Sequence, residues 1–165
     1  MKSGTKKLFS VFLIVVLSIS LAGCGKEISY PFLHGVDEIQ EIQIARIELD
    51  YEYQEFYLDR LDDCIVLADI EDTSEFIEKF SSDVLFSRYW WGDPTHLKHG
   101  DYVIKITYTN GDFELIGHYA QCRVDIEAAE RGGSLDSGQM LGYGGCSEDD
   151  FMNFINLYLD DPILS

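Results

Sequence analysis

The stretch YVIKITYTNGDFELIGHY, residues 102–119, decides the fold. On both sides of Asn110-Gly111 the residues alternate in character, and Asn-Gly is the pair favoured in a two-residue type I′ turn. The stretch therefore predicts a β-hairpin with strands at residues 102–109 and 112–119.

A two-residue turn also predicts which residues face each other across the hairpin. One face would be apolar and would hold the pairs Tyr108 with Phe113, Ile106 with Leu115, Ile104 with Gly117 and Tyr102 with Tyr119. The other face would be mixed and partly solvated, with the pairs Val103 with His118, Lys105 with Ile116 and Thr107 with Glu114. Because a shift of one residue would disrupt both faces, we expect a well-specified register.

Two segments predict helices that lie on the sheet. Asp72 can cap the first, with Glu75 at the third position. Its apolar stripe would hold Phe76, Ile77, Phe80 and Val84. Ser147 can cap the second, whose first turn carries three acidic residues where the helix dipole favours them. Its inward face would hold Phe151, Met152, Ile155, Tyr158 and Leu159.

Four other segments are expected to be extended: residues 39–49, 56–68, 85–91 and 139–143. In the first of them Ile42, Ile44 and Ile47 would point to the core. The order is then a strand pair, a helix, a meander and a final helix. It predicts an α+β fold after an N-terminal signal helix, in which two helices cover one face of an antiparallel sheet and the meander contains the Asn-Gly hairpin. We assign this single domain to residues 38–161.

The N-terminus is typical of a secretory signal. Lys2, Lys6 and Lys7 precede an apolar run at residues 8–21 that only serines interrupt. The run is shorter than the roughly 20 residues with which a helix spans a bilayer. A permanent transmembrane anchor is therefore the weaker interpretation, and we expect a signal peptide at residues 1–23.

Leu21-Ala22-Gly23-Cys24 ends this region and resembles the lipobox of prokaryotic membrane lipoproteins. The resemblance covers only the first 24 residues. It implies that the Cys24 sulfur receives a diacylglyceryl group, that signal peptidase II cuts after Gly23, and that Cys24 becomes the acylated N-terminus. Burial of acyl chains such as palmitate contributes about 0.8 kcal/mol per CH₂, so two or three chains make a durable anchor. The implied location is the outer face of the cell membrane.

The residues after Cys24 predict a tether. Residues 24–37 are mixed in character and include Gly25, Pro31 and Gly35. At roughly 3.3 Å per residue such a tether reaches at most about 45 Å, which keeps the domain close to the membrane.

Cleavage after Gly23 would leave a strongly acidic chain. The signal carries three lysines and no acids, so 9 Lys and Arg would face 30 Asp and Glu, a net charge of −21. Such a surface repels phosphate backbones and anionic headgroups, which argues against nucleic acid as a partner. The expected partners are cationic, such as a metal ion or a basic protein or peptide; alternatively, the acids only keep an exported domain soluble.

Tyr89, Trp90 and Trp91 form a candidate binding surface. Gly-Asp-Pro follows them and marks the end of an element and a turn. Large aromatic side chains on a loop could stack on a sugar or anchor a protein partner. The alternative is that they close the core at the edge of the sheet.

His96 and His99 form a weak candidate metal site. With Asp93 and Asp101 nearby, they could bring two imidazoles and a carboxylate to one divalent ion. The segment contains no third histidine, and a pair of this spacing in a loop is a common accident.

Cys64, Cys122 and Cys146 leave an odd number of thiols after Cys24. At most one intramolecular bridge can form, and the sequence does not say which of three. A bridge from Cys122 to Cys146 would close a glycine-rich segment, but pairing of residues 139–143 with the second hairpin strand would hold the two apart. We favour reduced or buried thiols.

Catalytic motifs do not occur in the sequence: it has no Gly-x-Ser-x-Gly elbow, phosphate loop, His-Glu-x-x-His or dinucleotide fingerprint. We therefore assign no catalytic residue and no cofactor. The prediction is a lipid-anchored extracytoplasmic domain that serves as a non-enzymatic binding or accessory module of the cell envelope. One alternative is an acidic inhibitor or immunity-type protein that neutralises a basic partner, and another is an envelope hydrolase or metal-binding protein.

Overall fold

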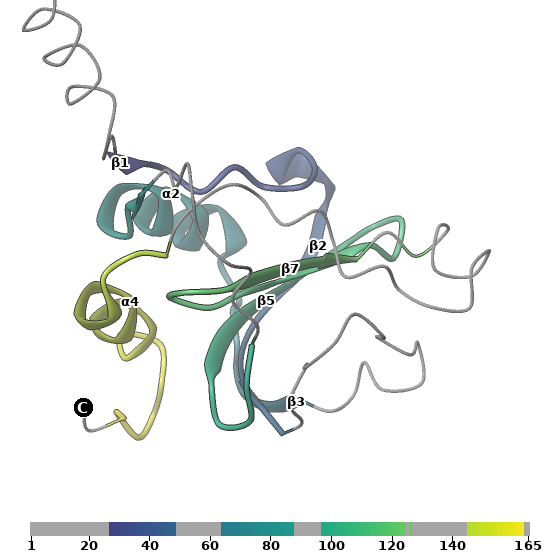
Figure 1. Ribbon diagram of the computed structural model, residues 1–165. Coiled ribbons are helices and arrows are strands. Elements are labelled where there is room, and N and C mark those ends of the chain that lie inside the picture. The colour runs from purple at the N-terminus through teal and green to yellow at the C-terminus, as the bar shows by residue number, and fades with distance from the viewer. Residues whose placement is uncertain (1–26, 49–63, 88–96, 125, 127–144, 164–165) are drawn as a thin grey trace, which may run out of the picture.

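The computed structural model describes residues 27–48, 64–87, 97–124, 126 and 145–163. They form the predicted α+β fold, with a five-stranded antiparallel sheet, a two-stranded sheet and two helices (Figure 1). The large sheet has the order β3-β2-β5-β6-β7, with β2 at Ile39–Ile47, β3 at Cys64–Asp69, β5 at Tyr102–Tyr108, β6 at Phe113–Ile116 and β7 at Gln121–Val124. Strand β1 (Glu27–Ile28) pairs with β4 (Phe86–Ser87), and a 3₁₀ turn, η1 (Val36–Glu38), leads into β2.

Helices α2 (Thr73–Asp83) and α4 (Glu148–Ile155) begin at the predicted caps. The Asp72 carboxylate accepts a hydrogen bond from the Glu75 N–H at 2.9 Å, and the Ser147 hydroxyl accepts one from the Asp150 N–H at 3.3 Å. These bonds satisfy backbone donors that have no partner inside a helix. Local capping signals therefore fix both helix starts.

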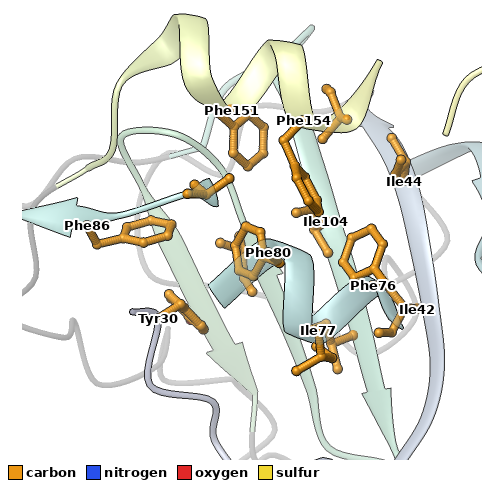
Figure 2. Packing of buried hydrophobic residues seen from close by; sticks show 14 of the residues in the cluster. Tyr30, Ile42, Ile44, Phe76, Ile77, Phe80, Phe86, Ile104, Phe151 and Phe154 are labelled. Atoms are coloured by element: carbon orange, nitrogen blue, oxygen red, sulfur yellow. The ribbon is translucent and has the colours of Figure 1, made fainter. Parts of the chain in front are cut away.

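The two helices cover one face of the sheet, where the main core lies (Figure 2). This core includes the large buried side chains of Ile42, Ile44, Phe76, Phe80, Phe86, Ile104, Ile106, Tyr108, Ile116, Phe151, Phe154 and Ile155. The rings of Phe76 and Phe154, one from each helix, meet edge to face with centroids 5.1 Å apart. Phe154 was missing from the predicted inward face of α4, and two predicted members, Tyr158 and Leu159, follow the helix and pack partly buried against the core.

The predicted hairpin forms, but its predicted register was wrong by one residue. Thr107 pairs with Phe113, and Ile106 pairs with Glu114. The loop has three residues rather than two: the Gly111 N–H donates to the Tyr108 carbonyl at 2.9 Å, and Gly111 adopts a φ of +92°. A three-residue hairpin loop with a glycine at positive φ is the next most common solution after the two-residue turn.

The register shift exchanges the two faces of β6. Phe113 and Leu115 lie on the face away from the helices, which was expected to be partly solvated. That face is instead buried as a second apolar cluster, whose members are Ala45, Ile47, Leu97, Val103, Phe113, Leu115, Ala120, Cys122 and Val124. Glu114 was expected on the partly solvated face and instead lies on the face that carries the main core.

The described part of the expected tether, from Glu27 onward, is folded. Ile28 pairs with Phe86, and Tyr30 is only 3% exposed within the main core. Phe32 and Leu33 pack against the same cluster. This segment, residues 27–34, is called the N-terminal segment below.

Candidate functional site

Glu114 is a fully buried carboxylate in the centre of the hairpin's second strand, with 0% of its surface exposed. Its Oε1 accepts hydrogen bonds from the Leu33 N–H at 2.6 Å and from the Tyr108 hydroxyl. Its Oε2 accepts from the Tyr30 hydroxyl and from Arg123 Nε, both at 2.7 Å. A buried charge is tolerated only when it is paired and hydrogen-bonded, and these four donors meet that requirement. We call this group of residues the Glu114 cluster.

Arg123 joins the sheet to the N-terminal segment. It lies directly opposite Glu114 in the pairing of β6 with β7. Its Nη2 donates to the Pro31 carbonyl, and its guanidinium lies over the Tyr30 ring, 5.5 Å from the centroid. One guanidinium therefore contacts a carboxylate, a backbone carbonyl and an aromatic face.

The hydroxyl groups of the Glu114 cluster are held in their protonated, donating form. Burial, followed by the negative charge of Glu114, raises the pKa of Tyr30 well above its usual value. The same two causes raise the pKa of Tyr108. Burial lowers the pKa of Arg123, but its interactions with Tyr30 and Glu114 outweigh burial and raise it. At neutral pH the cluster thus combines a charged guanidinium with two neutral phenols.

A second polar group lies beside the hairpin loop and also involves the N-terminal segment. His34 Nε2 lies 2.7 Å from Asp112 Oδ2, and Asn110 donates to the same oxygen at 2.8 Å. The Ile126 N–H donates to Asp112 Oδ1 at 2.9 Å. Burial raises the pKa of Asp112, but the hydrogen bonds from Ile126, His34 and Asn110 outweigh it and lower the pKa.

These two groups are suited to holding the chain in place. Both oxygens of Glu114 and both oxygens of Asp112 are occupied by partners from the protein itself. The bonds join the N-terminal segment to β6, to the hairpin loop and to β7, at sequence separations of 78 to 92 residues. The arrangement therefore fixes residues 30–34 onto the sheet.

The predicted metal pair is only half within the described residues, because His96 lies outside them. His99 Nδ1 lies 2.5 Å from the Glu48 carbonyl oxygen. The Asp101 carboxylate accepts from the Lys98 N–H at 2.6 Å and from the Tyr119 hydroxyl. Within the described ranges, no three His, Cys, Asp or Glu side chains are grouped to hold a metal ion. A metal site that includes His96 stays a prediction.

The other predicted site residues, Cys24, Tyr89, Trp90 and Trp91, also lie outside the described residues. Lipidation and an aromatic binding surface therefore stay predictions. In the part of the chain that the structure describes, no helix is long and apolar enough to cross a bilayer.

The cysteines lie on both faces of the large sheet. Cys122 is buried in the cluster away from the helices, and Cys146 is half-buried against the main core. Burial raises the pKa of Cys146 to about 12, so its thiol stays protonated at neutral pH. Since the thiolate is the reactive form, Cys146 is a poor nucleophile.

Sequence reasoning missed the Glu114 cluster, although two signals for it were present. Glu114 stands between Phe113 and Leu115, in a strand that is otherwise apolar. Arg123 is one of only nine basic residues in the acidic chain after Gly23. A lone charge in an apolar strand needs a partner, and the scarcity of basic residues narrows the choice of that partner.

In comparisons with known proteins, no protein-family model, no curated protein and no solved structure matches this chain.

Replacing Glu114 by Gln is expected to lower the free energy of unfolding by about 3 kcal/mol, because it leaves the largely buried guanidinium of Arg123 without its opposite charge. Urea unfolding followed by circular dichroism measures the change. The matched control is Glu41→Gln, an exposed site on β2, which should change stability by less than about 0.5 kcal/mol. Equal stability of the two variants would contradict the role assigned to Glu114.

The lowered pKa of Asp112 predicts that the domain loses stability in acid. The folded-state pKa of Asp112 lies below the usual 3.8, so its contribution is present above that pH and is lost as the pH falls through the folded pKa. The Asp112→Asn variant should be less stable than the wild type at neutral pH, and the gap should shrink as the pH falls to about 3. Urea unfolding at a series of pH values measures this gap. A gap that does not change with pH would rule out the charge of Asp112 as its cause.

Proposed function

We propose that this chain is a lipoprotein precursor whose mature domain is anchored by lipid on Cys24 at the extracytoplasmic face of the cell membrane. There it acts as a non-enzymatic binding or accessory module of the envelope. The lipobox-like Leu21-Ala22-Gly23-Cys24 supports the anchor. The observation that carries the binding role is an exposed apolar edge strand, β3, at the end of the fold away from the chain's entry.

The anchor would hold the domain close to the bilayer. Because Glu27 already pairs in β1, only Gly25 and Lys26 separate the lipidated residue from the folded domain. Three residue steps of about 3.5 Å span roughly 10 Å, much less than the reach expected of a longer tether. The end of the domain that contains β1 would therefore face the membrane.

The opposite end would then be accessible to other molecules. Figure 1 shows β1 beside α2 at the top of the molecule and β3 at the bottom. Ile65, Val66 and Leu67 of β3 are 42%, 42% and 40% exposed. Apolar side chains clustered at an exposed sheet edge are typical of an interaction site. This arrangement favours a module that is anchored at one end and binds at the other.

Anchoring is tested by growing bacteria that express the full chain with an alkyne analogue of palmitate, and then attaching a fluorophore to the labelled protein. The wild type should carry the label in the membrane fraction, and Cys24→Ala should lose it because the acceptor sulfur is gone. Cys146→Ala, which removes a half-buried thiol elsewhere, is the matched control and should keep the label. A label that persists in Cys24→Ala would contradict the proposal.

A further inference from the structure

Strand β3 is the last strand at one side of the large sheet. It pairs with β2 on one side and with no other strand among the described residues. The outward backbone groups of an edge strand can pair with a strand from another chain, and soluble proteins usually block them with Lys, Pro or a bulge. β3 contains no Lys or Pro. Of these blocking features it has only a bulge, which leaves Leu67 without a partner residue in β2.

The exposed side chains of β3 lie on both of its sides. Successive residues of a strand point to opposite faces, so Ile65 and Leu67 lie on one face and Val66 on the other, except as the bulge rotates them. Of the six large apolar side chains exposed in the described ranges, these three are consecutive. An added strand would therefore cover apolar surface as well as the backbone.

The sequence around β3 is acidic. Residues 61–78 contain no Lys or Arg and seven acids, which are Asp62, Asp63, Asp69, Glu71, Asp72, Glu75 and Glu78. Arg46, which lies opposite Ile65 in β2, is already paired with Glu48 at 3.0 Å. In the described part of the chain, the edge therefore combines an apolar centre with the acidic residues Asp69 and Glu71 at the end of the strand.

This charge distribution argues against a second copy of the chain as the occupant. Two paired β3 strands would bring no Lys or Arg to each other, because β3 contains neither, and each copy would add the carboxylates of Asp69 and Glu71 to the pair. Like charges across a strand pair are destabilising. A strand with Lys or Arg on either side of its apolar residues would complement the same edge.

We infer that the β3 edge binds an extended basic segment of a partner protein, which adds to the sheet as a further strand. Backbone hydrogen bonds would supply part of the affinity, contact with Ile65, Val66 and Leu67 a second part, and the flanking acids the preference for basic partners. This inference rests on the proposed function, because it names the partner of that binding module.

The test uses the purified full chain in detergent and a fluorescent peptide, Lys-Lys-Val-Thr-Val-Thr-Val-Lys-Lys. Fluorescence anisotropy should show binding that weakens about tenfold or more as the salt rises from about 0.05 to about 0.5 M, because salt screens the exposed charges. The same peptide with Glu in place of Lys should not bind measurably. Equal binding of the two peptides would overturn the inference.

The site is located with two variants of equal charge change, Val66→Lys and Leu157→Lys, and with one charge reversal, Glu71→Lys. Val66→Lys should weaken binding of the basic peptide about tenfold, because it places a positive charge and a polar side chain at the centre of the edge. Leu157→Lys is the matched control, because Leu157 is 67% exposed and lies beyond α4. Glu71→Lys changes only the exposed flank of the edge and should weaken binding about threefold. Equal affinities for Val66→Lys and Leu157→Lys would overturn the inference.

The remaining outcomes separate this inference from the proposed function. If sedimentation shows a dimer of the wild type that Val66→Lys dissociates, the occupant is a second copy and the inference is wrong. If Cys24 is lipidated but the basic peptide does not bind, the inference fails while the anchoring stands. If the peptide binds but Cys24 carries no lipid, the anchoring fails while the β3 site stands.

Discussion

The burial of one carboxylate, Glu114, is the constraint on which the rest of the structure depends. A carboxylate with no exposed surface needs donors for both oxygens, and here they come from β5, from β7 and from the backbone and a tyrosine of the N-terminal segment. Disruption of such a buried ion pair costs about 3 to 5 kcal/mol, a large share of the 5 to 15 kcal/mol that stabilises a typical domain. The sheet and the start of the domain are therefore stabilised together.

This constraint has a direct consequence for how the domain would sit in the cell envelope. The bonds of Tyr30, Leu33 and His34 to the sheet make the N-terminal segment part of the domain rather than a free linker. A lipid on Cys24 would then be attached almost directly to the fold, with the β1 end near the membrane and the β3 edge away from it. In this account the orientation of the module follows from the Glu114 cluster.

Local features of the sequence predicted most of the elements. The caps at Asp72 and Ser147, the apolar stripe of α2 and the hairpin around Asn110-Gly111 each depend on residues within a few positions of one another. The hairpin register was wrong because Asn-Gly fits both a two-residue turn and a three-residue loop with Gly111 at positive φ. Local sequence does not distinguish the two, and this single difference moved Glu114 from an expected solvated face into the core.

The Glu114 cluster could not be predicted from local sequence for a different reason. Tyr30 and Glu114 are 84 residues apart, so their contact exists only after the N-terminal segment folds back onto the sheet. The expected tether, residues 24–37, is mixed in character and contains Pro31 and Gly35, which is why it was predicted to be extended and unpacked. The exposed edge of β3 likewise depends on the strand order, which the sequence did not supply.

The most direct test of the central claim is native-state hydrogen exchange at the Leu33 amide, measured by NMR. Leu33 donates to Glu114 at 2.6 Å, whereas a tether would leave this amide in water. We expect the Leu33 amide to exchange only when the whole domain unfolds, with the same opening free energy as the Tyr108 amide in β5. Exchange of Leu33 at the rate of an unstructured peptide, while Tyr108 stays protected, would contradict the claim that the Glu114 cluster holds the N-terminal segment on the sheet.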